Sequence, residues 1–199
     1  MDIENIKMIL ASKSPRRKEI LSDAGYSFDI THSDFELDIN KKEYNDSLLL
    51  KCVGGKFDSI KASLISGHTN DLLVITADTV VVLNNTIIGK PKDNDDAFNI
   101  LNNLSDNTHF VATGVQIAHI FDRKIIDIKN DIEKTYVTFR KLSKDDINDY
   151  IKKSKPLDKA GAYGIQDDGF DFVTHIDGNI DNVIGFPMTL FHTLLNTIL

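Results

Sequence analysis

A cluster of basic and hydroxyl side chains occupies one short stretch near the amino terminus of an otherwise acidic chain. Its members are Ser12, Lys13, Ser14, Pro15, Arg16, Arg17 and Lys18. The apolar run before it and the proline within it predict a strand, a polar turn and the first turn of a helix. Cations at a helix amino terminus are unfavourable unless an anion lies among them, and N–H groups, hydroxyls and guanidinium groups all bind phosphate. The cluster is a candidate polyphosphate site; the alternative is a solvated turn whose cations bind nothing.

An aspartate and a threonine, Asp78 and Thr79, lie at the end of the apolar run Leu72 to Ala77, within the most apolar stretch of the chain, Leu72 to Leu83. In open α/β sheets, ligands collect at the carboxyl ends of strands, so an acid at this point is well placed for catalysis or for binding a metal. The alternative is an aspartate that only caps a turn. A carboxylate alone is a weak base at neutral pH, and a bound divalent cation would compensate by activating water and neutralising phosphate oxygens.

Two loops offer further donors. Residues 89–91 present Lys90 between a glycine and a proline, which suits a point-charge contact with phosphate. This is not a Walker loop, because no glycine-rich stretch precedes Lys90 and no serine or threonine follows it. Residues 158–166 are rich in small residues and include Gln166, whose amide could read the edge of a nucleobase with one donor and one acceptor. Taken alone, each loop is equally consistent with an ordinary connection.

The elements that must position these residues are strands and helices that do not alternate strictly. We expect strands at residues 7–11, 27–33, 72–83, 86–88, 110–120, 125–141 and 170–176. We expect helices at residues 15–24, from 46 or 47 to about 66, behind a cap at Asp93, at 143–153, and from about Pro187 onward. This order favours an α/β fold on a mixed sheet, with residues 1–199 forming one domain.

Composition excludes several classes of function. The formal net charge of -7 leaves no basic face for duplex nucleic acid, so any phosphate chemistry must depend on a local patch. The single cysteine, Cys52, rules out an internal disulfide and a zinc cluster built on thiolates. The apolar runs are far shorter than the roughly 20 residues of a membrane span. Met1, Asp2 and Glu4 form an acidic amino terminus, not a basic signal-peptide region, so we expect a cytoplasmic protein without a membrane partner.

The motifs occur together in a known order. Residues 10–17, 77–79, 89–91, 158–166 and 183–187 resemble the Maf family of nucleotide pyrophosphatases, also called septum formation inhibitors. The resemblance extends over essentially the whole chain, and five motifs together are far more specific than any one of them. It implies a mixed twisted sheet flanked by helices, with two lobes around a central cleft, as in inosine triphosphate pyrophosphatases.

The resemblance also implies roles for individual residues. Asp78 matches the acid that accepts a proton from the attacking water, with Mg²⁺ or Mn²⁺ nearby. Residues matching the triphosphate cradle are Ser12, Arg16, Arg17, Lys56 and Lys90. Arg16, Thr79 and Gln166 match the set found in members selective for dTTP and UTP, whereas relatives that act on 7-methyl-GTP differ at these places. Homodimers are known in the family.

The chain departs from the family pattern at three places. The family usually has two adjacent acids after the second strand, whereas here Glu36 is followed by Leu37 and then Asp38. The metal ligands beside Asp78 are therefore Glu36 or Asp38. Gly54 and Gly55 precede Lys56 where helix formers are usual, and a phenylalanine at position 186 replaces a leucine.

The expected reaction is hydrolysis of dTTP or UTP to the monophosphate and pyrophosphate. One rival is a nucleotide-binding regulator of division that turns nothing over, and another is a phosphatase that releases orthophosphate. Carboxylates beside bound phosphate favour catalysis over simple anion binding, because they repel the ligand unless they have a chemical role.

Overall fold

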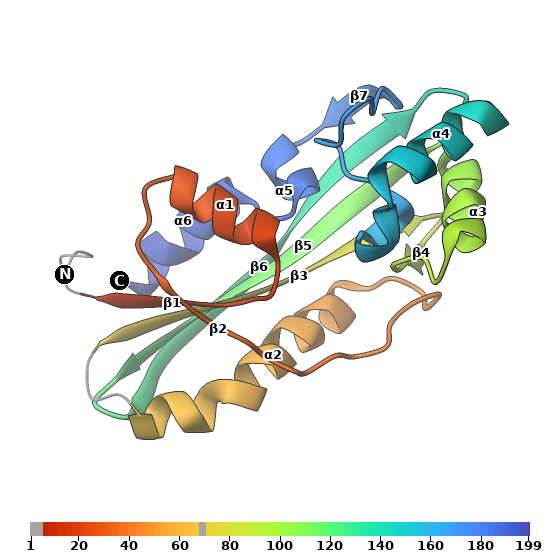
Figure 1. Ribbon diagram of the computed structural model, residues 1–199. Coiled ribbons are helices and arrows are strands. Elements are labelled where there is room, and N and C mark those ends of the chain that lie inside the picture. Colours follow the sequence, from red (N-terminus) through yellow and green to blue (C-terminus); the bar gives the residue numbers. More distant parts are fainter. Residues whose placement is uncertain (1–5, 68–70) are drawn as a thin grey trace.

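The computed structural model describes residues 6–67 and 71–199, so the acidic amino terminus with Met1, Asp2 and Glu4 lies outside the described residues. Its centre is a seven-stranded mixed sheet in the order β2-β1-β3-β5-β6-β7, with β4 paired to β3 (Figure 1). The strands are β1 (Lys7–Ala11), β2 (Asp29–Thr31), β3 (Leu72–Leu83), β4 (Thr86–Ile88), β5 (Thr108–Phe121), β6 (Lys124–Phe139) and β7 (Val173–Asp177). The predicted α/β class with a mixed sheet is confirmed.

Six α-helices and two 3₁₀ turns flank the sheet within the described residues. They are α1 (Pro15–Asp23), α2 (Asp46–Gly67), α3 (Asn94–Leu104), α4 (Lys144–Ser154), η2 (Pro156–Asp158), η3 (Ala160–Ala162), α5 (Ile180–Ile184) and α6 (Met188–Ile198). Local sequence explains several starting points. Ser14 caps α1 with Pro15 in its first turn, Asp93 caps α3, and Ser143 forms a capping box with Asp146 at the start of α4. None of the helices in the described part is long and apolar enough to cross a membrane.

The edge of β3 is open at its middle. Strand β1 runs parallel to β3 and pairs with it only over Leu72 to Ile75, whereas β4 is antiparallel and pairs only over Val81 to Leu83. Both lie on the same edge, because β5 occupies the other edge of β3 along almost its whole length. Residues 76–80 therefore have no strand partner on this edge in the described part of the chain. Asp78 and Thr79 lie in this opening.

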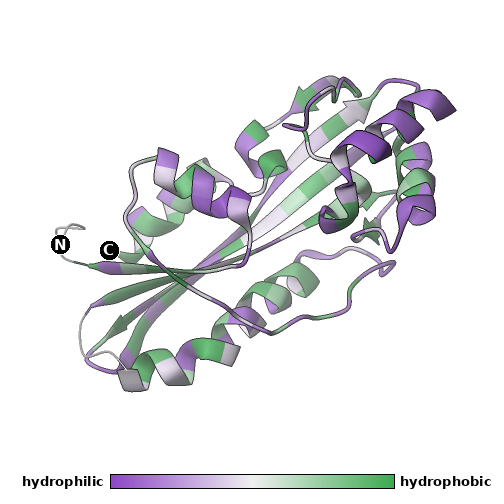
Figure 2. Cartoon of the chain, viewed as in Figure 1, coloured by the Kyte–Doolittle hydropathy of each residue, from purple (hydrophilic) through white to green (hydrophobic). Residues whose placement is uncertain are grey.

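Separate groups of core residues cover the two ends of the sheet. At one end, Leu21 of α1 and Phe191 of α6 pack with β1 and the first half of β3. At the other end, Leu101 of α3 and Ile147 of α4 pack with Val81 of β3, with the start of β5 and with the end of β6. Helices α3, α4 and α6 turn hydrophobic residues inward and leave most of their hydrophilic residues outside, as expected for helices that cover a sheet; Figure 2 gives the hydropathy of each residue. The helices at both ends thus frame the opening in β3.

Some predicted boundaries were wrong for identifiable reasons. The strand expected at 27–33 is limited to Asp29–Thr31, because β2 pairs with β1 over only these three residues. The strand expected at 170–176 begins at Val173, which is the first residue to pair with β6, while the rings of Phe170 and Phe172 pack against Tyr150. The strand expected to reach residue 141 ends at Phe139. The short helix α5 was not predicted, because five residues give too little periodicity.

The two glycines in α2 have different surroundings. A Cβ atom on Gly55 would lie 2.3 Å from ring carbons of Phe35. A Cβ atom on Gly54 would have the Gln116 amide oxygen as its nearest neighbour, at 3.6 Å. Phe35 directly precedes Glu36, so its ring anchors that loop on α2. Because Gly55 has no side chain, the ring of Phe35 can pack directly on α2, and this packing holds the loop against the helix.

This contrast predicts opposite effects of two alanine substitutions. Gly54→Ala should raise the free energy of unfolding by up to about 1 kcal/mol, because alanine favours the helix and fits the space. Gly55→Ala should lower it by about 1–3 kcal/mol, because the new methyl group displaces Phe35. Urea unfolding of both variants provides the measurement. Equal effects would contradict packing of Phe35 on Gly55.

A buried histidine gives the fold a pH dependence. His109 is 2% exposed, and its Nε2 lies 2.8 Å from the hydroxyl of Tyr163. Burial lowers the pKa of His109 from 6.5 to about 4, so the folded protein keeps it neutral where the unfolded chain takes up a proton. Its contribution to stability is complete above pH 6.5 and is lost progressively as the pH falls toward 4.

We therefore expect the free energy of unfolding to fall by about 2 kcal/mol between pH 7 and pH 5 because of His109. Urea unfolding at the two pH values should show a smaller loss of stability in His109→Gln than in the unaltered protein. His175 is exposed and provides the control, since His175→Gln should keep the original pH dependence. An unchanged pH dependence in His109→Gln would refute this assignment.

Candidate active site

The predicted site residues surround one cavity of about 970 Å³ at the open edge of β3. Its lining includes Ser12, Arg16, Arg17, Glu36, Lys56, Asp78, Thr79, Lys90 and Gln166. Asp38 does not line this cavity but an adjoining one of about 490 Å³, which it shares with Glu36 and Asp78. The main cavity lies at the upper end of the size range of small-molecule and cofactor sites. Segments far apart in the sequence thus meet around a space that could hold a nucleotide.

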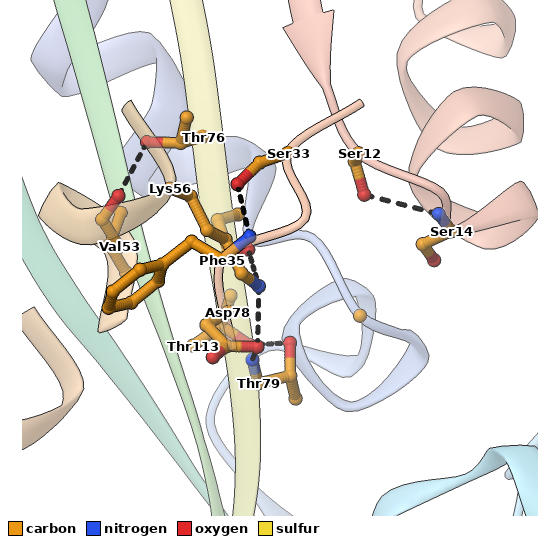
Figure 3. A network of polar contacts seen from close by, with 12 residues as sticks. Ser12, Ser14, Ser33, Phe35, Val53, Lys56, Thr76, Asp78, Thr79 and Thr113 are labelled. Atoms are coloured by element: carbon orange, nitrogen blue, oxygen red, sulfur yellow. Dashed lines mark hydrogen bonds and ion pairs between the residues drawn. The ribbon is translucent and has the colours of Figure 1, made fainter. Parts of the chain in front are cut away.

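Asp78 is held in a defined orientation. Its Oδ1 lies 2.9 Å from the ammonium of Lys56 and accepts a hydrogen bond of 3.1 Å from the backbone N–H of Thr79 (Figure 3). Lys56 extends from α2 and also donates to the backbone oxygen of Ala77, at 3.1 Å. The Asp78 carboxylate is 29% exposed, so a ligand can reach it. The pair places an acid and a cation together at the floor of the cavity.

Asp78 and Thr79 project from opposite faces of β3, because successive side chains of a strand alternate. Thr76, on the same face as Asp78, donates its hydroxyl to the backbone oxygen of Val53 in α2, and Lys56 approaches from the same helix. Thr79 contacts Arg17 on the other side of the sheet. Both side chains line one cavity, since β3 has no partner at this edge to separate the faces. A long ligand can therefore pass around the strand.

Arg17 makes more hydrogen bonds to other parts of the protein than the sequence suggested. Its guanidinium is buried and donates to the backbone oxygens of Gly185 at 3.0 Å and Ala77 at 2.9 Å. It also donates to the hydroxyls of Thr79 at 2.9 Å and Ser12 at 3.3 Å. Burial lowers the pKa of Arg17 from its usual value. Four donor contacts leave little capacity for phosphate, so this geometry favours positioning over a place in the cradle.

The loops that carry Lys90 and Gln166 are joined directly. The N–H of Gly161 donates to the backbone oxygen of Gly89 at 3.1 Å. The N–H of Gly89 donates in turn to the side chain of Asn40 at 3.0 Å. Gly161 has a φ of 71°, which glycine adopts without strain. Lys90 and Gln166 are both exposed at the cavity, where they can contact a ligand.

The remaining cations of the cavity differ in how freely they can move. Arg16 lies 3.7 Å from the carboxylate of Asp158, and Lys13 bonds Asp34 at 2.9 Å. Lys159 is mostly buried and lies 3.1 Å from Asp158 and 3.6 Å from Asp167. In residues 6–67 and 71–199, Lys90 makes no ion pair. Arg16 has a long, weak pair and Lys90 has none, so these two are the most available for an incoming anion.

The two candidate metal ligands beside Asp78 are not equivalent. Glu36 is exposed and lines both cavities. Asp38 uses its Oδ1 to accept from the backbone N–H of Asn40 at 3.2 Å and reaches only the smaller cavity. The described residues contain no preformed group of three or more His, Cys, Asp or Glu side chains that could hold a metal. A cation here would therefore need oxygens from a ligand and water as well as from the protein.

Sequence reasoning missed Thr113, which lies behind the cavity, and Asn40, which lines it. Thr113 of β5 is fully buried, and its hydroxyl lies 2.9 Å from that of Thr79. No local pattern around Thr113 distinguishes it from other small residues in a buried strand. Asn40 was also missed, although an asparagine in a loop is a common donor and acceptor for turn backbone.

Comparison with known proteins identifies the family. The family model described as Maf-like protein matches residues 7–198. The chain belongs to the Maf-like protein family. Among curated Maf-like relatives, the dTTP/UTP pyrophosphatase of Clostridium botulinum (strain Eklund 17B / Type B) is 42% identical over 195 residues, which cover 96% of this chain and 98% of that protein. The dTTP/UTP pyrophosphatase of Bdellovibrio bacteriovorus is 39% identical over 95% of this chain and 97% of that protein.

Solved structures resemble the Maf-like chain more distantly. The nucleoside-triphosphatase, or dITP/XTP pyrophosphatase, of Mycobacterium abscessus aligns over 97% of both chains at 9% identity and a TM-score of 0.41. This likeness is too weak to support an argument about the site.

Proposed function

We propose that the protein is a nucleoside triphosphate pyrophosphatase that hydrolyses dTTP and UTP to the monophosphate and pyrophosphate. The observation that carries the proposal is one cavity in which a carboxylate, Asp78, lies among cations from four separate segments. A pure anion binder would gain nothing from that carboxylate and would lose affinity by repulsion. The names of the curated relatives support the same activity.

The cations of the cavity would bind the triphosphate and stabilise the leaving group. Arg16 and Lys90 are the side chains most available to contact phosphate oxygens, and Ser12 adds a hydroxyl from the turn before α1. Lys56 would contact phosphate beside Asp78, where charge builds up as pyrophosphate leaves. Electrostatic stabilisation and positioning supply most of the catalysis of phosphoryl transfer.

Asp78 would accept the proton of a water that attacks the α-phosphorus. The water oxygen bonds to phosphorus, the bridging oxygen leaves with the electron pair, and the products are a nucleoside monophosphate and pyrophosphate. The bonds from Lys56 and from the Thr79 N–H keep the carboxylate aimed at the cavity, so the base is oriented before the substrate binds.

The donors fit a divalent cation. Asp78 and Glu36 supply carboxylate oxygens, which suit Mg²⁺ or Mn²⁺, and Mg²⁺ is often bound by one or two carboxylates together with substrate phosphates. A bound cation would neutralise phosphate oxygens and make the water more acidic. We assign Glu36 to this role in preference to Asp38, because Asp38 reaches only the adjoining cavity and already bonds Asn40.

A cytoplasmic site of action, where nucleoside triphosphates are abundant, is part of the proposal. The structure describes one chain, and a homodimer remains an expectation from the family resemblance.

A panel of triphosphates tests the proposed activity. The protein is incubated with dTTP, UTP, CTP, ATP and GTP in Mg²⁺ and in Mn²⁺, and products are resolved by phosphorus NMR. We expect pyrophosphate as the product, with kcat/KM for dTTP and UTP at least about tenfold above the others. Release of orthophosphate would indicate a phosphatase, and binding without any product would indicate a nucleotide-binding regulator.

A further inference from the structure

We infer that Thr113 and Arg17 fix the hydroxyl of Thr79 as a hydrogen-bond donor toward the substrate, so that the site accepts a carbonyl oxygen of uracil or thymine and rejects the amino group of cytosine. This inference rests on the proposed function, because it assigns the base that the same cavity selects. Thr113 and Arg17 are positioning residues in this scheme, and Thr79 is the residue that touches the base.

Strand register brings the two threonines together. Thr79 of β3 and Thr113 of β5 are directly opposite in the antiparallel pairing, and their hydroxyl oxygens lie 2.9 Å apart (Figure 3). Thr113 is fully buried, and Thr79 is the only hydrogen-bond partner of its hydroxyl found in the described part of the chain. Water cannot reach Thr113, so its proton has Thr79 as its acceptor. The reverse arrangement would leave a buried O–H without an acceptor, which is unfavourable.

A second donor points at the same oxygen. The guanidinium of Arg17 donates to the Thr79 hydroxyl at 2.9 Å, and a guanidinium can only donate. A hydroxyl has one proton and two lone pairs. With Thr113 and Arg17 both donating, both lone pairs of Thr79 are occupied. Its own proton is then directed away from both partners, into the cavity that Thr79 lines.

The surroundings of Thr79 suit a nucleobase better than a phosphate. Val81 lies on the same face of β3, and Val111 lies opposite Val81 on β5. Both line the cavity, as does the buried ring of Tyr163. Apolar walls of this kind accommodate a flat ring, whereas the Asp78–Lys56 pair lies on the opposite face of the sheet. A donor at this position requires an acceptor on the base. Uracil and thymine provide one in the carbonyl at ring position 4, where cytosine carries an amino group, whereas the carbonyl at ring position 2 is common to all three bases and cannot distinguish them.

Removing the Thr113 hydroxyl tests the inference. The values of kcat/KM for UTP and CTP are measured by pyrophosphate release in the unaltered protein and in Thr113→Val, which keeps the side-chain shape. In the variant, one lone pair of Thr79 is released, and its hydroxyl can rotate to accept from the cytosine amino group. We expect the UTP-to-CTP ratio to fall by about five- to tenfold or more. Thr113→Ser, which restores the hydroxyl, should restore the ratio.

Thr76→Val is the matched control. Thr76 is also a fully buried threonine, and its hydroxyl donates to the backbone oxygen of Val53, but it does not line the cavity. This variant loses one buried hydrogen bond next to the same strand opening and should keep the original ratio. Thr79→Val should lower the ratio at least as much as Thr113→Val.

The result that overturns the inference is a ratio unchanged in Thr113→Val, or an equal fall in Thr113→Val and Thr76→Val. If the unaltered protein turns over no triphosphate, the proposed function fails separately. The affinities for UTP and CTP, measured by calorimetry, then give the same preference without turnover. A UTP preference in binding that falls in Thr113→Val supports the inference, and a preference insensitive to Thr113 refutes it.

Discussion

Asp78→Asn is expected to reduce pyrophosphate release from UTP by about 10²–10⁴-fold, the usual contribution of a general base. Asparagine has nearly the same shape and can still accept from Lys56 and from the Thr79 N–H, so the cavity should keep its geometry. It cannot take a proton from water at neutral pH, and it is a poorer ligand for a divalent cation. The measurement is kcat for UTP at saturating Mg²⁺, with circular dichroism to confirm the fold.

Asp34→Asn provides the control for this experiment. Asp34 lines the same cavity, but its carboxylate is 92% exposed and bonds only Lys13 among the described residues. Its removal changes the local charge by the same amount as Asp78→Asn and should leave kcat close to the original value. A near-normal kcat in Asp78→Asn, or equal losses in both variants, would show that Asp78 is not the base.

Glu36→Gln should raise the Mg²⁺ concentration needed for half-maximal activity by about tenfold or more, because the cation loses a charged ligand. Asp38→Asn should change this concentration far less, since Asp38 reaches only the adjoining cavity and its Oδ1 is engaged by Asn40. Titration of activity with Mg²⁺ in the two variants provides the comparison. The two substitutions remove the same charge from the same loop.

The opposite order of effects would assign the metal to Asp38 and not to Glu36. Equal activity of both variants at every Mg²⁺ concentration would mean that neither carboxylate binds the cation. Binding of Mn²⁺ alone, followed by electron paramagnetic resonance, gives a readout that does not depend on turnover.

The positions of the site residues were predictable because they lie in local motifs. Ser14 and Pro15 mark the turn before α1, as the sequence indicated. The expectation that Asp78 lies at the carboxyl end of a strand was wrong, because β3 continues to Leu83 and Asp78 reaches the cavity at an open edge in the middle of the strand. The residue types then indicated phosphate chemistry. That these segments line one cavity is a property of the fold, and the resemblance to a family supplied it before the structure did.

The features that sequence did not predict depend on contacts between segments that are distant along the chain. The role of Thr113 requires the register of β3 against β5, which no local pattern encodes. The need for Gly55 depends on the ring of Phe35 lying over α2, although sequence had suggested only a weakened helix. The internal bonds of Arg17 could not be foreseen either, because three of its acceptors lie 60 or more residues away along the chain. Sequence predicts which donors exist, and packing decides which remain free for a ligand.

Hydrolysis of UTP in ¹⁸O-labelled water tests the central claim most directly. If the water oriented at Asp78 attacks the α-phosphorus, mass spectrometry should find the label in uridine monophosphate and none in pyrophosphate. Label in pyrophosphate would place the attack at the β-phosphorus, and labelled orthophosphate would mean that the terminal phosphate is removed. The first of these results would contradict attack at the α-phosphorus, and the second would contradict release of pyrophosphate altogether.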